Sequence, residues 1–331
     1  MRVLHLTDTH LGVVRVVQRP GEAHPSSTLV AQDAERALRA ALAPALHGEV
    51  DLVVHTGDVF DRSRPPRRVV QAAAELFALV ARRVPTVLMA GNHDRRGLLR
   101  HLPVQVAGLH VIDRPTRLEV GGLALGVVPF ERTAAGWAVA AQLAVGPGVD
   151  LLLAHQAFHG HAVPTAFREG VGGEEPARWF RFRTGVQADT IGEEHVPASV
   201  RHVLCGHLHP RQVVEVGEAT VVCPGSTVRT SFAERHVPCS VAHWGLDREV
   251  SWAFRDVPSR PMHVVAEGAA GEAALARVRP GDLVRVASEA RLRLVHARGG
   301  WVVGAARPER APRASSPSSA QLTLLPESRR G

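Results

Sequence analysis

The sequence predicts an α/β fold built on a layered and mostly parallel β-sheet. In the first half of the chain, short apolar runs alternate with longer stretches of helical periodicity, which is the pattern of successive β-α-β units. Polar clusters rich in aspartate and histidine directly follow several of the apolar runs. Because the carboxyl ends of strands in layered α/β folds converge on one crevice, these clusters predict a single functional site.

The elements can be placed in order along the chain. Apolar runs of strand length predict strands over residues 2–6, 51–55, 86–90, 123–128, 151–154, 203–205, 212–216, 220–223, 236–243 and 250–254. One alanine-rich helix is expected to start at a cap formed by Ser26 or Ser27 and to end near residue 47, and a second helix is expected over residues 66–83. The polar, glycine-rich segment 170–192 fits either a loop or a β-hairpin.

The chain is predicted to have three parts. Residues 1–257 form the main domain, because strands and helices alternate there and the sheet is expected to finish shortly before Pro258. Residues 258–306 predict a small α/β unit with a strand near 262–266, a helix near 272–278 and further strands. Residues 307–331 are rich in proline, serine and arginine, a composition typical of disorder.

Composition narrows the class of protein. No apolar run approaches the roughly 18 residues needed to cross a membrane, and the amino terminus lacks the pattern of a signal peptide. The three cysteines form no C-x-x-C pair, which indicates buried thiols in a reducing compartment, and we therefore expect a cytoplasmic protein without a membrane segment. The net charge of +7 rests on arginine without any lysine, so either a polyanionic partner or a compositional drift explains it.

The polar clusters suit a pair of divalent metal ions. Carboxylates and imidazoles together favour Mn²⁺, Fe²⁺ or Zn²⁺, whereas Mg²⁺ and Ca²⁺ favour oxygen ligands. One carboxylate shared by both ions would hold them about 3.5–4 Å apart. Each cluster alone is weak evidence, but all five after apolar strands predict a metal site: Asp8-Thr-His10, Gly57-Asp58-x-x-Asp61-Arg62, Gly91-Asn92-His93-Asp94, His155-Gln156 and Gly206-His207-Leu-His209.

This set of motifs resembles the calcineurin-like metallophosphoesterases over about residues 1–245, and within them the SbcD-type DNA-repair exonucleases. The closer likeness lies in GDVFDRSRPP, LLLAHQAF and GHLHPRQV followed by CPGSTVRTSFAE. The resemblance implies a four-layer β-sandwich flanked by helices. It also implies a small, truncated C-terminal α/β cap, because residues 258–306 are fewer than the cap that SbcD-type nucleases usually carry.

The resemblance also implies roles for individual residues. The first metal would be held by Asp8, His10 and His209, the second by Asn92, His155 and His207, with Asp58 bridging both. His93 would act as general acid or stabilise the transition state, and Asp61 would accept a hydrogen bond from His93 and orient it. The cofactor would be two divalent metal ions, with Mn²⁺ expected and Fe²⁺ or Zn²⁺ as alternatives.

The function implied is a dinuclear-metal-dependent DNA phosphodiesterase, an exonuclease or endonuclease of DNA repair. A hydroxide shared by the two ions would attack the phosphate, and His93 would protonate the leaving sugar oxygen. The family implies a homodimer and an SbcC-like coiled-coil ATPase as partners. Arg62, Ser226 and Arg229 are candidate contacts to DNA, although a purely structural turn explains the last two equally well.

Two other functions fit the same sequence. A phosphoesterase that acts on a small molecule, such as a nucleotide or cyclic nucleotide, would need the same ligands, since the fold and the metals do not determine the substrate. A non-catalytic DNA-binding scaffold is the third alternative. It is disfavoured because every expected ligand is present in the sequence.

Overall fold

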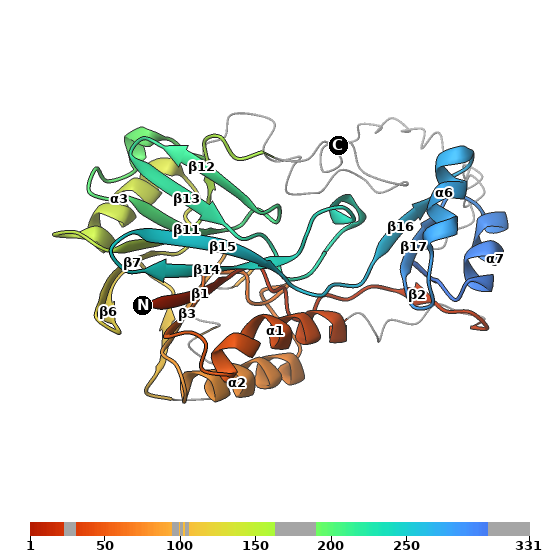
Figure 1. Cartoon of the computed structure of the whole chain (residues 1–331), viewed down its shortest axis with the longest axis horizontal. Helices are drawn as coiled ribbons and strands as arrows, with labels where there is room; N and C mark the ends of the chain where they lie inside the picture. Colours follow the sequence, from red (N-terminus) through yellow and green to blue (C-terminus); the bar gives the residue numbers. More distant parts are fainter. Residues whose placement is uncertain (23–30, 95–98, 100–101, 103–105, 163–189, 304–331) are drawn as a thin grey trace, which may run out of the picture.

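The computed structural model describes residues 1–303 except 23–30, 95–98, 100–101, 103–105 and 163–189. Within these ranges, two six-stranded sheets lie face to face (Figure 1). Sheet 1 has the order β15-β14-β1-β3-β4-β5 and sheet 2 the order β12-β13-β11-β8-β7-β6. Neighbouring strands are parallel at the centre of each sheet. Antiparallel strands complete both edges of sheet 2 and the β15 edge of sheet 1, whereas β5 at the other edge of sheet 1 is parallel to β4.

The strands of the two sheets have the following bounds. Sheet 1 contains β1 (Arg2–Leu6), β3 (Leu52–His55), β4 (Thr86–Met89), β5 (Leu109–Ile112), β14 (Ser240–Leu246) and β15 (Val250–Asp256). Sheet 2 contains β6 (Thr116–Val120), β7 (Leu123–Val128), β8 (Leu151–His155), β11 (His202–Gly206), β12 (Gln212–Val216) and β13 (Ala219–Cys223). A short parallel pair, β9 (Ala157–Phe158) and β10 (Thr190–Ile191), lies beside them.

Helices cover the outer face of each sheet and complete four layers (Figure 1). Helices α1 (Ala31–Leu46) and α2 (Arg67–Ala81) pack on sheet 1, and α3 (Ala134–Val145) packs on sheet 2. Alternation along β1 divides its side chains, because Leu4 faces the helices whereas Val3 faces the other sheet. The predicted α/β fold, a four-layer β-sandwich flanked by helices, is confirmed.

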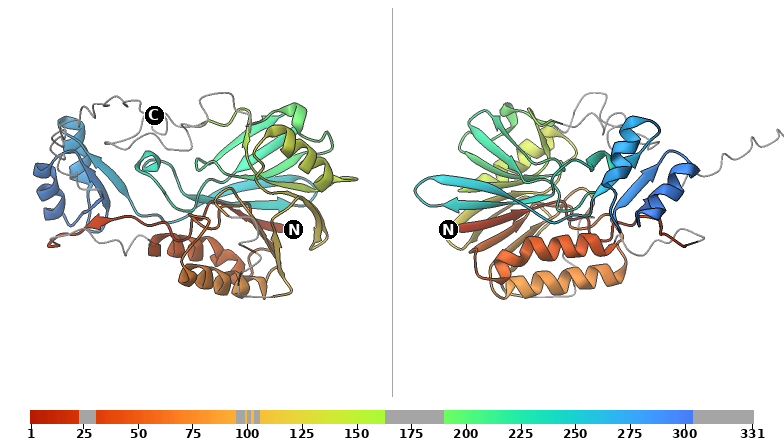
Figure 2. Two further views of the ribbon diagram at one scale, coloured as in Figure 1. Left: turned by 180° about the vertical axis from the view of Figure 1, so that it is seen from behind. Right: turned by 45° about the vertical axis from the view of Figure 1, so that its right-hand side comes forward.

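A smaller sheet forms a C-terminal unit at one end of the sandwich (Figure 2). We use this name for residues 262–303, which form β16 (Met262–Val265), α6 (Ala269–Arg277), β17 (Leu283–Val286), α7 (Glu289–Ala297) and β18 (Trp301–Val303). The sheet order is β16-β17-β18-β2, and its last strand, β2 (Val17–Gln18), comes from the N-terminal region. Val303 pairs with Val17, so the C-terminal segment does not build this sheet alone.

Several elements differ from the sequence prediction. Helices α3 and α7 and strands β2, β5 and β6 were not expected. The strand predicted over 236–243 lies instead at Ser240–Leu246, because the 3-10 turn η3 (Phe232–Glu234) is followed by a further turn in which the N–H of Val237 donates to the carbonyl oxygen of Glu234. Another 3-10 turn, η2 (Glu193–His195), follows β10. The predicted caps Ser26 and Ser27, the tail 307–331 and most of segment 170–192 lie outside the described residues.

Two further predictions, drawn from the composition, concern membrane-spanning segments and the state of the cysteines. None of the helices in the described ranges is both long enough and apolar enough to span a membrane. The three cysteines, Cys205, Cys223 and Cys239, are all free and buried.

Candidate metal centre

The polar clusters meet where the central parallel strands of both sheets end. Asp8, Asp58 and Asn92 follow β1, β3 and β4 of sheet 1. His155 ends β8 and His207 follows β11 in sheet 2. The seven predicted ligands therefore come from both sheets and share one region of the molecule.

Asp8, His10 and His209 form the first group. The Nε2 atoms of His10 and His209 lie 3.0 Å apart, and each lies 3.9 Å from Oδ1 of Asp8. That Oδ1 atom is buried and has no hydrogen-bond partner among the described residues. A buried carboxylate oxygen that faces two ring nitrogens needs a positive charge, so this group fits a divalent cation.

Asn92, His155 and His207 form the second group. Oδ1 of Asn92 lies 3.1 Å from Nε2 of His155 and 2.8 Å from Nδ1 of His207. Oδ2 of Asp58 lies 3.4 Å from Nε2 of His155. Ligand atoms of Asp8, Asp58 and His155 all lie within 4.8 Å of one another, so Asp58 stands between the two groups, where a bridging ligand must be.

The backbone is strained at four of these ligands. Among the described residues, the non-glycine residues with positive φ are Asp8 (49°), His10 (42°), Asp58 (54°) and His207 (93°). Such conformations cost on the order of 1–3 kcal/mol each, and they persist where the surrounding structure enforces them, often at functional sites. The strain therefore coincides with the predicted metal ligands rather than with ordinary turns.

Glycines before two ligands allow the loops to approach closely. Gly57 has a φ of +104°, and a Cβ atom there would lie 2.4 Å from Nδ1 of His155. A Cβ atom on Gly91 would lie 2.2 Å from Oδ1 of Asp58. Any larger residue at either position would displace a ligand, which explains the glycine in both motifs.

Hydrogen bonds behind the ligands fix which ring nitrogen faces the site. Nδ1 of His155 donates to the carbonyl oxygen of Thr56 at 2.7 Å, and Nδ1 of His209 donates to Oε1 of Glu234 at 3.1 Å. Both acceptors lack a hydrogen, so each Nε2 keeps its lone pair for a metal. Asp94 accepts backbone N–H groups of Val59, Phe60 and Gly91 and so joins the loops that carry Asp58 and Asn92.

Charge coupling dominates the titration of the buried groups. Burial is the largest single influence on Asp58 and His155 and opposes their ionisation, but their mutual attraction and the other charged neighbours together outweigh it, so the pKa of Asp58 is lowered and the pKa of His155 is raised to about 9. In the same way, burial opposes the charge of His209, but Glu234, Asp8 and Asp58 together raise its pKa to about 9. A cation bound to these nitrogens would compete with the protons, so metal binding is coupled to proton release.

His93 lies beside the two groups, and an atom of its ring lies within 4.8 Å of ligand atoms of His10 and Asp58. Its Nε2 lies 4.0 Å from Oδ2 of Asp58, and its side chain is 41% exposed. Its Nδ1 donates to the main-chain carbonyl oxygen of Asp61 at 2.7 Å, not to the carboxylate that the sequence predicted. The Asp61 carboxylate lies instead 3.8 Å from Nδ1 of His10. Residue 61 thus orients His93 through its backbone.

The three candidate DNA contacts lie in different environments. Arg62 is 52% exposed and lies next to Asp61. Ser226 is only 1% exposed. Arg229 donates to the carbonyl oxygens of Glu234, Val237 and Arg260 and to the Ser259 hydroxyl. The geometry does not support a substrate contact by the side chains of Ser226 and Arg229, because the first is buried and the second binds the protein itself.

Two outer residues of the site were not assigned from the sequence. Asp94 was visible in its motif but received no role, and Glu234 was quoted only within TSFAE. Ser231 and Glu234 have the S-x-x-E spacing of a capping box, and Oγ of Ser231 does donate to Oε1 of Glu234 at 3.1 Å. That spacing signals a turn, but it carries no information about the contact with His209.

A layered α/β sandwich with carboxylates and imidazoles gathered at its strand ends is typical of metal-dependent phosphoesterases. The chain belongs to the calcineurin-like phosphoesterase family, whose model matches residues 1–211.

Curated relatives agree with the SbcD-like character predicted from the motifs. The DNA double-strand break repair protein Mre11 of Methanosarcina mazei is 26% identical over 277 residues, which are 82% of this chain and 40% of that protein. The SbcD component of the SbcCD nuclease of Bacillus subtilis is 26% identical over 267 residues, 71% of this chain and 63% of that protein. Mre11 of Sulfolobus acidocaldarius is 33% identical over 97 residues, 28% of this chain and 22% of that protein.

The matches cover between 22% and 63% of the lengths of these relatives. Among solved structures, an archaeal phosphodiesterase aligns with a TM-score of 0.36 and 12% identity, over 77% of this chain and 100% of that chain.

Proposed function

We propose that the protein is a dinuclear-metal-dependent DNA phosphodiesterase, with Mn²⁺ as its metal. The observation that carries the proposal is the convergence of seven side chains into two adjoining groups with Asp58 between them. The first metal would be held by Asp8, His10 and His209, and the second by Asn92, His155 and His207. Mixed nitrogen and oxygen donors favour Mn²⁺, Fe²⁺ or Zn²⁺ over Mg²⁺.

The residues of the site have different roles in the proposed hydrolysis. Two cations bound here would supply an activated water and offset the charge of the phosphate oxygens. Asp58, buried between the groups, fixes the spacing of the ligands. His93 presents Nε2 to the open side of the centre and delivers a proton to the departing sugar oxygen. The carbonyl oxygen of Asp61 holds the opposite nitrogen of that ring and so aims the proton.

DNA is the proposed substrate for two reasons. Relatives that match much of the chain are named as a DNA repair protein and as part of a nuclease. The net charge of +7 favours a polyanion, and Arg62 is an exposed cation next to Asp61, whose carbonyl oxygen binds His93. A small nucleotide or cyclic nucleotide is the competing substrate, since the same metal ligands would serve it.

The proposed context is DNA repair in the cytoplasm. The SbcD-like motifs support a homodimer that works with a coiled-coil ATPase similar to SbcC. Residues 1–257 would form the nuclease domain and residues 258–306 a small cap, to which β2 adds a strand.

One comparison of substrates tests the proposal. The purified protein is incubated with Mn²⁺ and either linear DNA, bis-p-nitrophenyl phosphate or cyclic nucleotides, with and without EDTA. Shortening of DNA that stops in EDTA supports the nuclease. Turnover of the small esters alone would assign a small-molecule phosphoesterase, and DNA binding without any turnover would assign a scaffold.

A further inference from the structure

The 3-10 turn η3 (Phe232–Glu234) connects the C-terminal unit to the metal centre. We propose that the C-terminal unit positions the metal ligand His209 through this turn, with Glu234 as the positioning residue. The inference rests on the proposed metal centre, and it adds a role for a part of the chain that supplies no ligand. Three sets of contacts carry it.

The first set holds the Glu234 carboxylate. Glu234 is 2% exposed, and its oxygens accept the N–H of Thr230 at 2.6 Å, the hydroxyl of Thr230 at 2.8 Å and the hydroxyl of Ser231 at 3.1 Å. The remaining contact is Nδ1 of His209 at 3.1 Å. A carboxylate fixed by three donors of its own turn is a rigid acceptor, so it determines the orientation of the His209 ring.

The second set ties the same turn to the C-terminal unit. Phe232 is fully buried and packs with Val17, Met262, Leu283 and Val303, which belong to the four strands of the small sheet. The guanidinium carbon of Arg285 on β17 lies 4.7 Å from the centre of the Phe232 ring. Phe232 and Glu234 are two residues apart in one turn, so a shift of the small sheet moves the carboxylate that holds His209.

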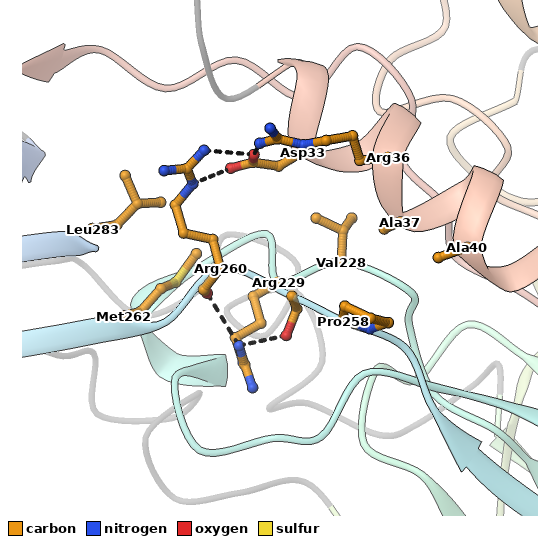
Figure 3. Close-up of a pocket in the computed structure, with 11 residues that line it drawn as sticks. Asp33, Arg36, Ala37, Ala40, Val228, Arg229, Pro258, Arg260, Met262 and Leu283 are labelled. Atoms are coloured by element: carbon orange, nitrogen blue, oxygen red, sulfur yellow. Dashed lines mark hydrogen bonds and ion pairs between the residues drawn. The ribbon is translucent and has the colours of Figure 1, made fainter. Parts of the chain in front are cut away.

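The third set of contacts joins the segment just before the C-terminal unit to the sandwich, and it includes the ion pair between Arg260 and Asp33 (Figure 3). Nε of Arg229 donates to the carbonyl oxygen of Glu234 at 3.1 Å, and its NH1 donates to the carbonyl oxygen of Arg260 at 3.2 Å. Arg260 in turn forms a two-point ion pair with Asp33 of α1 at 2.6 and 2.8 Å and donates to Gly281 of the C-terminal unit at 2.6 Å. These arginines border a cavity of about 320 Å³.

The contacts form one path from α1 and the small sheet to a ligand of the first metal. Residues that orient metal-binding histidines typically change metal affinity by about 10- to 100-fold when they are replaced. In the second group, the carbonyl oxygen of Thr56, and not Glu234, holds Nδ1 of His155. Replacement of Glu234 is therefore predicted to change the affinity of the first metal site and not that of the second.

Calorimetric titration of the full chain with Mn²⁺ tests the role of Glu234. Glu234→Ala is expected to weaken one of two binding events about 10- to 100-fold and to leave the other unchanged. Glu234→Gln, which keeps an acceptor oxygen, is expected to restore part of the loss. Glu215→Gln is the matched control, because Glu215 lies on β12 and its carboxylate accepts a hydrogen bond from the hydroxyl of Thr220, away from the proposed path. Circular dichroism in EDTA confirms that each variant is folded.

A second pair of variants tests the coupling to the C-terminal unit. Phe232→Ala is expected to weaken the same binding event as Glu234→Ala. Val295→Ala is the control, because Val295 is buried in the other core of the unit and does not touch the turn. If Phe232→Ala and Val295→Ala bind Mn²⁺ with the same affinities, the proposed coupling between the C-terminal unit and the metal centre is overturned. If Glu234→Ala binds two ions with wild-type affinity, the positioning role is overturned. Wild-type protein that binds no Mn²⁺ would instead overturn the metal centre itself.

Discussion

The Nε2 atoms of His10 and His209 lie 3.0 Å apart, although the two residues are 199 positions apart in the chain. Two unprotonated ring nitrogens at this distance repel each other, and two protonated ones repel more strongly. Only a shared proton or a shared cation makes the contact favourable. Because Oδ1 of Asp8 faces both rings and has no hydrogen-bond partner in the part of the chain that the structure describes, a divalent cation satisfies all three groups at once.

The first prediction is that Mn²⁺ stabilises the folded chain. A ligand that binds only the folded state at 100 times its dissociation constant adds about 2.7 kcal/mol to the free energy of unfolding. We expect the melting temperature to rise with Mn²⁺ and to return to its starting value in EDTA. Asp58→Asn should remove most of this rise, whereas Asp247→Asn, at an 85% exposed position, should keep it. An Asp58→Asn protein with the full rise would contradict the bridging role.

The second prediction concerns His93. His93→Ala is expected to bind both metal ions, because all seven proposed ligands remain in the variant. The rate of phosphodiester hydrolysis should fall about 10²- to 10⁴-fold, the usual contribution of a general acid. Metal content and turnover of the same preparation decide the outcome. His47→Ala, at a 69% exposed position, is the control. Native turnover in the His93 variant would exclude the proposed role.

The third prediction separates the backbone of residue 61 from its side chain. Since the carbonyl oxygen of Asp61 holds Nδ1 of His93, Asp61→Asn should retain this bond. We expect the turnover of Asp61→Asn to stay within about tenfold of the wild-type value, because the general acid His93 is still present and still oriented. The turnover of His93→Ala should be far lower, because that variant has lost the general acid itself. Initial rates on one phosphodiester substrate compare the two variants. Equal losses would mean that the carboxylate orients His93 after all.

The sequence predicted that the polar clusters would meet in one region, because each cluster follows an apolar strand and strand ends converge in layered folds. The sequence could not identify Glu234 as the partner of His209, since that contact depends on how two distant loops pack. It could not place Val17 in the C-terminal sheet either, because a two-residue strand leaves no periodic signal. Helix α3 was missed because it is apolar on all sides, with Val139 and Leu143 exposed, so no amphipathic pattern appears.

The fourth prediction is a loss of stability in acid that depends on His5. Burial, and then the charge of His55, lower the pKa of His5 from 6.5 to about 3. Below pH 6.5 the unfolded chain therefore takes up a proton that the folded chain does not. Stability should fall as the pH drops from 6.5 towards 3, by up to about 1.4 kcal/mol per pH unit for this residue. Urea unfolding in EDTA at several pH values between 6.5 and 3 gives the free energy of unfolding as a function of pH. The slope of this dependence should be shallower for His5→Gln than for the wild type, and equal slopes would contradict the prediction.

The fifth prediction tests contact with DNA at Arg62, the exposed cation beside the loop that holds His93. Arg62→Gln should weaken DNA binding and lower the slope of log affinity against log salt by about one, because one phosphate contact is lost. Turnover of bis-p-nitrophenyl phosphate should not change, since Arg62 does not hold a metal. Arg248→Gln is the control, because it removes the same charge at an exposed position that follows β14. This end of β14 lies beside Met1, at the start of β1, whereas the metal centre lies at the other end of β1. If both variants lose DNA affinity equally, the loss reflects net charge alone and Arg62 does not line the path of the DNA.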